Sequence, residues 1–139
     1  MTTQTVLSAY FGYRDAVQAI DWLGKALGFE PTMQFPDEHG GIMHAELRLG
    51  DAAIVVFSDR DGYERAPRRG DTAGHGLYLS VDSEETVDRI YQQAVAEGAT
   101  TIWAAGRSEW NYRFRVADPE GFEWTVGTYR FGEPQPEWS

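Results

Sequence analysis

The sequence predicts an α+β fold of two tandem βαβββ modules whose curled, mixed sheets form a half-barrel-like cavity. The first observation is an internal repeat with a period of 68 residues, half of the 139-residue chain, carried by the pairs Ser8 and Gly76, Tyr10 and Tyr78, and Asp15 and Ser83. The second is that each copy has the same order of patterns, an alternating strand, an amphipathic helix and three further strands. One face of four mostly antiparallel strands packs on the helix, which leaves the opposite face free to curl around a ligand.

The first module is expected over residues 5–58. Alternating apolar and polar residues predict a strand over 5–13, and Asp15 can cap the helix that follows. Gly28 stands where a left-handed helix terminator belongs. The remaining strands of this module are expected over 29–35, 42–49 and 52–57, with turn-forming residues between them.

The second module is expected over residues 75–130, after a polar connector at 59–74 that is rich in Gly, Arg and Asp. A strand at 75–81 leads to a helix that Asp82 or Ser83 can cap. Further strands are expected over 100–104, 110–116 and 122–129. Residues 131–139 are predicted to be a loosely ordered tail. The whole chain, 1–139, is therefore expected to be a single domain made of two modules.

The composition argues against several classes of function. A net charge of −10 argues against a nucleic-acid partner, because phosphate contacts need clustered Lys and Arg. Without cysteine the chain can form no disulfide or thiolate metal site. No apolar run approaches a membrane span of about 20 residues and no signal peptide is evident, so we expect a cytoplasmic protein with no membrane partner. The acidity is compatible with a cationic ligand, although many domains are acidic only for solubility.

Several segments carry a family resemblance. They are Tyr13-Arg-Asp15, Trp22-Leu23, Leu27-Gly-Phe29, the run from His44 to Asp51 and, most specifically, Asp118-Pro-Glu-Gly121-Phe-Glu-Trp124. Together they resemble the glyoxalase/bleomycin-resistance/extradiol-dioxygenase superfamily, also called vicinal oxygen chelate proteins, over about residues 5–130. The resemblance implies paired βαβββ modules and a homodimer. It does not determine function, because this fold hosts several unrelated chemistries.

The same resemblance implies where a metal would bind. Metal enzymes of the superfamily take one ligand from the first strand and one from the last strand of each module. By motif, these positions are Ser8, Val55, Gly76 and Thr125 in this sequence. None offers the imidazole or carboxylate that a divalent ion needs. We therefore expect no metal and no other cofactor, which puts glyoxalase, fosfomycin-transferase and dioxygenase activities in doubt.

An enzyme remains the alternative: a divalent-metal-dependent lyase, isomerase or dioxygenase with a displaced metal site built from His44, Glu46, His75 or Glu123. His44 and Glu46 share a strand face, which suits an acid–base pair or an exposed polar stripe continued by Arg48. Alternation turns His75 away from the face of Gly76, which favours a structural histidine. Glu123 shares the face of Thr125 and is the best carboxylate for contacting a polar or cationic ligand.

The aromatic residues, five Trp, seven Tyr and seven Phe, are the strongest positive signal. Aromatic walls suit planar molecules and cations, although a filled core or a dimer interface is also aromatic. The leading interpretation is a metal-independent protein that binds an aromatic or amphipathic compound, cationic compounds included, and resembles drug-sequestering resistance proteins. A dimeric module that binds another protein is a third possibility. The candidate ligand-binding residues are Ser8, Tyr10, Val55, Gly76, Tyr78, Trp103, Trp110, Tyr112, Glu123 and Thr125.

Overall fold

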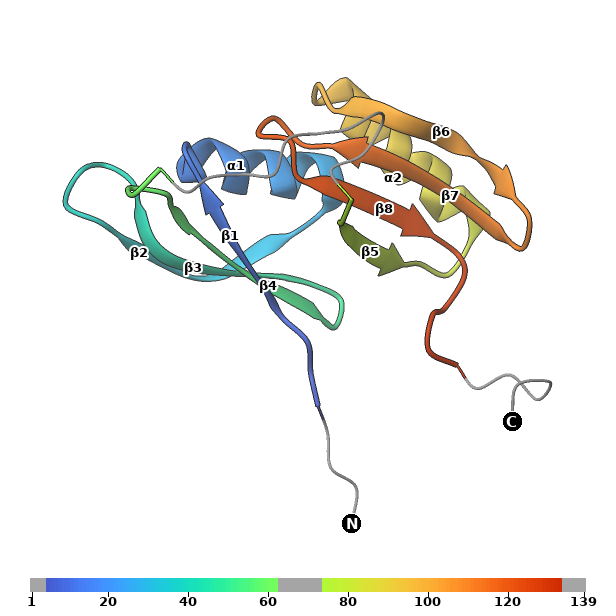
Figure 1. Ribbon diagram of the computed structural model, residues 1–139, viewed down its shortest axis with the longest axis horizontal. Coiled ribbons are helices and arrows are strands. Elements are labelled where there is room, and N and C mark those ends of the chain that lie inside the picture. Colours follow the sequence, from blue (N-terminus) through green and yellow to red (C-terminus); the bar gives the residue numbers. More distant parts are fainter. Residues whose placement is uncertain (1–4, 63–73, 134–139) are drawn as a thin grey trace, which may run out of the picture. The chain divides into compact units, whose positions relative to one another are not determined.

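The computed structural model describes residues 5–62 and 74–133 and divides the chain into two compact units, Met1–Pro67 and Arg68–Ser139 (Figure 1). The division falls within the predicted connector, of which residues 63–73 lie outside the described residues, as do 134–139 of the predicted tail. Each unit holds one four-stranded mixed sheet and one helical segment. The predicted α+β class and the tandem βαβββ order are confirmed.

Unit one contains six elements in the order β1 (Ala9–Tyr13), α1 (Ala16–Trp22), the π-helical turn η1 (Leu23–Leu27), β2 (Glu30–Pro36), β3 (Ile42–Leu49) and β4 (Ala52–Ser58). Its sheet has the order β1-β4-β3-β2, with β1 parallel to β4 and the other pairs antiparallel.

Unit two repeats this arrangement with β5 (Leu77–Ser80), α2 (Glu84–Ala96), β6 (Thr100–Ser108), β7 (Asn111–Ala117) and β8 (Glu123–Gly127). Its sheet order is β5-β8-β7-β6, and β5 is parallel to β8. The register repeats as well, because Tyr10 pairs with Val55 in unit one as Tyr78 pairs with Thr125 in unit two.

The helices begin where the sequence predicts. The Oδ1 atom of Asp15 accepts a hydrogen bond from the Gln18 amide at 3.0 Å, and Ser83 caps α2 in the same way through Thr86 at 3.1 Å. Gly28 ends the first helical segment with φ at 98°, a conformation that favours glycine. The helix expected up to Leu27 widens into the π-helical turn η1 before it reaches that glycine.

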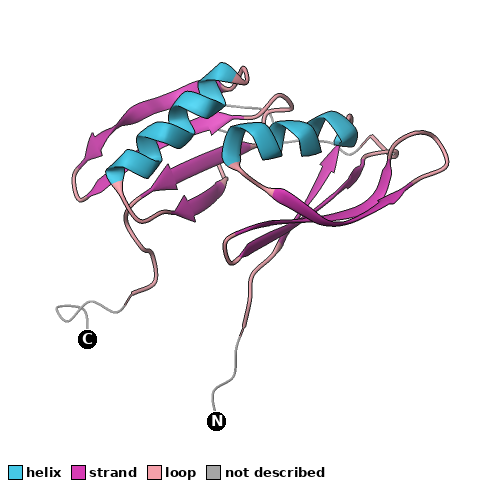
Figure 2. Ribbon diagram, turned by 180° about the vertical axis from the view of Figure 1, so that it is seen from behind, coloured by secondary structure: helices cyan, strands magenta, loops and turns pink. Residues whose placement is uncertain are grey.

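Each helix lies across one face of its own sheet, as Figure 2 shows. The two cores consist of the apolar side chains on those faces, because burying a large apolar side chain stabilises the folded state by about 1.5–3 kcal/mol. The most deeply buried large members are Tyr13, Leu23, Leu27, Leu47 and Val56 in unit one, and Val87, Phe114, Val116, Trp124 and Val126 in unit two. Trp22 is buried in the core of unit one as well.

Two strand boundaries differ from the prediction by four residues, and the others by at most two. The first strand begins at Ala9 rather than at residue 5, and the pairing of β1 with β4 begins with Ala9 opposite Ile54. The expected turn after residue 104 is instead a continuation of β6 to Ser108, which pairs with Asn111 in a tight hairpin. Glu109 makes this hairpin possible with a φ of 51°, unusual for a residue other than glycine.

Among the described parts of the chain, no helix is long and apolar enough to cross a membrane.

Candidate ligand-binding site

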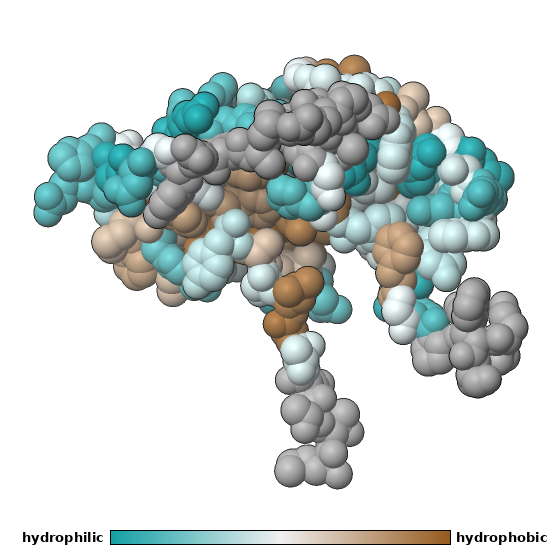
Figure 3. Space-filling view, viewed as in Figure 1, coloured by the Kyte–Doolittle hydropathy of each residue, from teal (hydrophilic) through white to brown (hydrophobic). Residues whose placement is uncertain are grey.

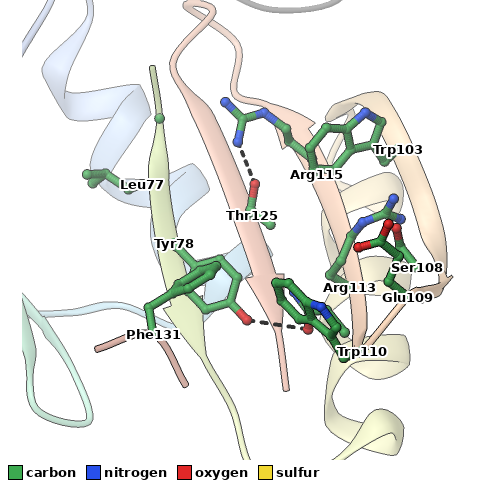
Figure 4. A pocket seen from close by; sticks show the side chains of 12 residues that line it. Leu77, Tyr78, Trp103, Ser108, Glu109, Trp110, Arg113, Arg115, Thr125 and Phe131 are labelled. Atoms are coloured by element: carbon green, nitrogen blue, oxygen red, sulfur yellow. Dashed lines mark hydrogen bonds between the residues drawn. The ribbon is translucent and has the colours of Figure 1, made fainter. Parts of the chain in front are cut away.

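The sheet face of unit two that α2 does not cover carries a pocket of about 440 Å³ (Figure 4). This volume falls within the range of roughly 300–1,000 Å³ that is usual for small-molecule sites. Five of the ten residues proposed from sequence line it: Gly76, Tyr78, Trp103, Trp110 and Thr125. Residues that were not proposed also line it, chiefly Asn111, Arg113, Arg115 and Phe131.

Strand alternation determines which side chains reach this pocket. On β7, Asn111, Arg113 and Arg115 line the pocket. The residues between them turn to α2: the Phe114 ring lies 5.1 Å from that of Tyr91 on the helix. On β8, Thr125 lines the pocket while Trp124 and Val126 are fully buried. Because side chains alternate across a strand, β7 and β8 each supply residues to the pocket on one face and to the core on the other.

The Asp118–Trp124 motif has a structural role that aligns β8 with the pocket. The Oδ1 atom of Asp118 accepts hydrogen bonds from the amides of Glu120 and Phe122, each at 3.0 Å. Its Oδ2 atom accepts one from the indole nitrogen of the buried Trp124 at 3.2 Å. Gly121 completes the turn with φ at 94°. The turn and the anchored indole therefore orient Glu123 and Thr125 toward the pocket face.

Arg115 forms a hydrogen-bonded cluster with Glu123 and Thr125 at one end of the pocket. Its Nε and Nη2 atoms donate to Oε1 of Glu123 at 2.9 and 2.7 Å, and Nη1 donates to Oγ1 of Thr125 at 2.7 Å. The Glu123 side chain is 1% exposed and that of Arg115 is 14% exposed. Glu123 is therefore committed to an ion pair within the protein, and the cluster presents a guanidinium rather than a carboxylate.

Gly76 makes room for that guanidinium. A Cβ atom at Gly76 would lie only 2.7 Å from Nη2 of Arg115 and 3.0 Å from the Glu123 carbonyl oxygen. The guanidinium thus occupies the space where a side chain at position 76 would lie and donates to Thr125; these are the two positions of this module at which the sequence resemblance placed metal ligands.

Aromatic rings form the opposite end of the pocket, where Figure 4 shows Tyr78, Phe131 and Trp110 gathered together. The Tyr78 ring lies 4.4 Å from that of Phe131, and Trp110 lies 4.5 Å from Tyr129. The Tyr78 hydroxyl donates to the Tyr129 carbonyl at 2.7 Å, and burial raises the pKa of Tyr78. This hydroxyl is therefore neutral at pH 7 and bound to the chain, so Tyr78 presents mainly its ring to the pocket. Phe131 belongs to the segment expected to be a tail.

Trp103 on β6 connects the two ends through its contacts with both pocket arginines. The guanidinium carbons of Arg113 and Arg115 lie 4.6 and 5.4 Å from the centre of the Trp103 ring system. Such distances are typical of cation–π stacking. Arg115 is hydrogen-bonded to Glu123 as well, whereas no hydrogen bond or salt bridge joins Arg113 to any residue in 5–62 or 74–133.

Tyr112, the remaining aromatic candidate from the second module, is not brought to the pocket. It lies on the other face of β7, where its hydroxyl donates to Oδ1 of Asp88 on α2 at 2.7 Å. This hydrogen bond to a carboxylate raises the pKa of Tyr112. Its contacts tie the helix to the sheet.

The candidate residues of unit one lie on or beside the uncovered face of the first sheet. Tyr10 is 73% exposed, and it neighbours Val55, which in turn neighbours Glu46 across the strands. Ser8 is exposed and precedes β1. Hydrophobic atoms gather over this sheet in Figure 3. His44 and Glu46 form a pair, with Nε2 of His44 2.8 Å from Oε2 of Glu46.

The four residues considered for a displaced metal site are divided between the two units. His44 contacts Glu46 in unit one, Glu123 is paired with Arg115 in unit two, and His75 is an exposed residue just before β5. Within the residues that the structure describes, no group of three or more His, Cys, Asp or Glu side chains could hold a metal ion.

Comparisons with known proteins agree with this architecture. The family model described as the glyoxalase/bleomycin resistance protein/dioxygenase superfamily matches residues 8–126. The uncharacterised protein Rv0887c of Mycobacterium tuberculosis (strain ATCC 25618 / H37Rv) is 28% identical over 129 residues, which cover 91% of this chain and 76% of that protein.

Two solved structures have the same fold at low sequence identity. TnmS3, an antibiotic binding protein from Streptomyces sp. CB03234, matches with a TM-score of 0.65 and 19% identity, over 91% of this chain and 96% of its own. The fosfomycin resistance protein FosX from Listeria monocytogenes, solved with Mn(II) and sulfate, matches with a TM-score of 0.70 and 11% identity, over 95% of this chain and 98% of its own.

Proposed function

Because the chain belongs to the glyoxalase/bleomycin resistance protein/dioxygenase superfamily, we propose that it is a metal-independent small-molecule-binding protein of that superfamily. In this proposal the pocket of unit two binds a planar aromatic or amphipathic compound, and binding sequesters a drug or metabolite. The antibiotic-binding protein TnmS3, which has the same fold, supports this kind of function. Affinity comes from stacking and from the removal of water between aromatic surfaces.

The observation that carries the proposal is the position of the Arg115 guanidinium. It fills the space where a side chain at position 76 would lie and donates to Thr125, the two positions where metal enzymes of the superfamily would supply ligands, and Glu123 holds it there. A fixed positive charge repels a divalent cation, and glycine has no side chain with which to bind one. The only buried carboxylate on this face, among the described residues, already accepts two hydrogen bonds from the arginine.

The aromatic end of the pocket supports the choice of ligand. Trp103 is 39% exposed and Trp110 is 63% exposed, yet both line the pocket. Exposed tryptophans of this kind cost little to desolvate further and offer flat surfaces to a planar ligand.

The proposal is tested with protein purified without a histidine tag, in three steps. Elemental analysis should find no stoichiometric divalent metal. Thermal-shift screening against planar aromatic compounds should give stabilisation by at least one of them, about 2.7 kcal/mol when the compound is present at 100 times its Kd. Treatment with EDTA should leave that stabilisation unchanged.

Two variants locate the binding site. Trp110→Ala removes an exposed aromatic surface from the pocket and should weaken binding. Val95→Ala removes a comparably exposed apolar side chain from α2, outside the pocket, and should leave binding unchanged. Uniformly null shifts across the library would contradict the sequestration proposal. Bound metal at one equivalent, lost with His44→Ala or Glu46→Ala, would favour the metal-dependent lyase, isomerase or dioxygenase instead.

A homodimer in the cytoplasm is part of the same proposal. Edge strands β2 and β6 each have one unpaired side within their own sheet, which is compatible with association. Sedimentation velocity of the purified protein measures the oligomeric state.

A further inference from the structure

Of the two arginines that line the pocket, Arg113 is the one without a carboxylate partner among the described residues. Figure 4 shows it between Trp110 and Trp103, on the same strand face as Arg115. It is half-buried, and no hydrogen bond or salt bridge joins it to another residue in the described ranges 5–62 and 74–133. The five N–H donors of its guanidinium therefore have no hydrogen-bond partner among the described residues.

Trp103 lies next to this guanidinium. The guanidinium carbon lies 4.6 Å from the centre of the indole, so the ring contacts the cation and restricts it. Stacking of a guanidinium on an aromatic ring uses its face and leaves its N–H groups free at the edges. Those edges match the two oxygens of a carboxylate in a pair of parallel hydrogen bonds.

Neither of the carboxylates in or beside the pocket forms a salt bridge with Arg113. Glu123 is hydrogen-bonded to Arg115 through both Nε and Nη2. Glu109, the acidic residue that lines the pocket near Arg113, is exposed and forms no salt bridge with it. Because Glu109 is exposed, water and salt weaken its electrostatic interaction with Arg113. The pocket therefore offers one available positive charge next to its aromatic walls.

From this arrangement we propose that the ligand of the pocket is a planar aromatic carboxylate, with its rings against Trp110 and Tyr78 and its carboxylate on Arg113. The inference rests on the proposed small-molecule function and specifies the ligand class. It reverses the charge that the acidic composition suggested, because the net charge of −10 belongs to the whole chain whereas the pocket presents arginine.

The test compares three probes of nearly equal shape by isothermal titration calorimetry: 2-naphthoate, 2-naphthamide and 2-naphthylmethylammonium. The wild-type protein should bind 2-naphthoate at least tenfold more tightly than the neutral amide, because charge-assisted bidentate hydrogen bonds are stronger than neutral ones. The ammonium probe should bind more weakly than the amide. This comparison needs no substitution, so it does not depend on the folding of a variant.

Arg113→Met should remove the preference for 2-naphthoate over 2-naphthamide while it leaves the affinity for the amide within about threefold. Arg89→Met, which removes an exposed arginine from α2 outside the pocket, should keep the full preference. Thermal unfolding of both variants checks that each remains folded. Equal affinities of the wild type for all three probes, or a preference for the ammonium, would overturn the carboxylate inference alone. The absence of binding for every probe, with null shifts across the wider aromatic library, would overturn the proposed function and this inference together.

Discussion

Asp37 is an acidic side chain held by several donors at the turn between β2 and β3. Its Oδ1 atom accepts hydrogen bonds from the amides of His39 and Gly41 at 2.7 and 2.8 Å, and its Oδ2 atom accepts one from Arg60. The Arg60 hydrogen bond is the main reason why the pKa of Asp37 falls from 3.8 to about 2. Hydrogen bonds and a cation both favour the ionised carboxylate, so this turn is stabilised by a charge.

This interaction gives a pH-dependent prediction. A carboxyl whose pKa is depressed on folding stabilises the folded state above its unfolded pKa, and the stabilisation disappears as pH falls through the folded pKa. Arg60→Met should therefore lower the free energy of unfolding at pH 7, and its difference from the wild type should shrink between about pH 4 and pH 2. Urea denaturation across this range measures the difference.

The matched control is Arg89→Met, whose difference from the wild type should stay constant over the same range, because no salt bridge or hydrogen bond ties Arg89 to a described carboxylate. An Arg60→Met difference that does not change with pH would show that Arg60 stabilises the turn by packing alone.

The pocket residues on β7 show which properties the sequence of a single strand can predict and which it cannot. Alternation along β7 separates Asn111, Arg113 and Arg115 from the apolar residues of the same strand, and this signal was present in the sequence. Their role required the pairing of β7 with β8, which places Arg115 beside Thr125. Glu123 neutralises the charge of Arg115 through a contact between two strands, which the pattern along one strand does not predict.

At the scale of single elements, the start of α2 illustrates a local rule that the sequence states clearly. Ser83 is extended, with φ −155° and ψ 158°, and its hydroxyl oxygen accepts a hydrogen bond from the Thr86 amide. Asp82, the other candidate cap, accepts instead from the Thr86 hydroxyl at 3.0 Å. Only one residue can hold the N-cap conformation, and the backbone selects Ser83.

Substitutions at this cap should follow N-cap preferences. Ser83→Ala should lower the free energy of unfolding by about 1 kcal/mol, because it leaves an amide at the helix start without its partner. Ser83→Asp should retain the wild-type stability, and Ser83→Gly should lose only a few tenths of a kcal/mol. Equilibrium urea denaturation of the three variants measures these changes in the free energy of unfolding. An equal loss for Ala and Gly would indicate that the packing of the Ser83 side chain matters, and not its hydrogen bond.

Element boundaries were less predictable than element types. The sequence placed every strand and both helices, but β6 runs four residues beyond its expected end at residue 104. A left-handed backbone at Glu109 closes the β6–β7 hairpin, and no glycine at that position indicates such a turn in the sequence. Trp110 reaches the pocket because this hairpin is tight.

For the molecule as a whole, the dominant physical property is its excess of negative charge, 22 acidic residues against 12 basic ones. Like charges repel one another across the surface and oppose compaction, and salt shortens the range of that repulsion from about 30 Å at 0.01 M to about 8 Å at 0.15 M. The pair between Arg115 and Glu123 is nearly buried and is screened much less.

The melting temperature at pH 7.5 should therefore rise, by on the order of a few degrees, when NaCl is increased from about 10 to 150 mM. The same experiment near pH 4.6, the sequence pI, is the control, because there the net charge is close to zero and the salt effect should vanish or reverse. Differential scanning calorimetry measures both. A melting temperature that falls with salt at pH 7.5 would indicate that exposed ion pairs outweigh the general repulsion.

The sequence by itself determined the two-copy organisation and the order of elements in each copy. These properties follow from periodicity and local conformational preference, which depend only on residues close together in the sequence. The tertiary structure decided the charge of the pocket and the place of each candidate residue. Whether Glu123 is available or paired, and whether Tyr112 faces the pocket or α2, depends on contacts between neighbouring elements, which form only when the sheet and its helix pack together.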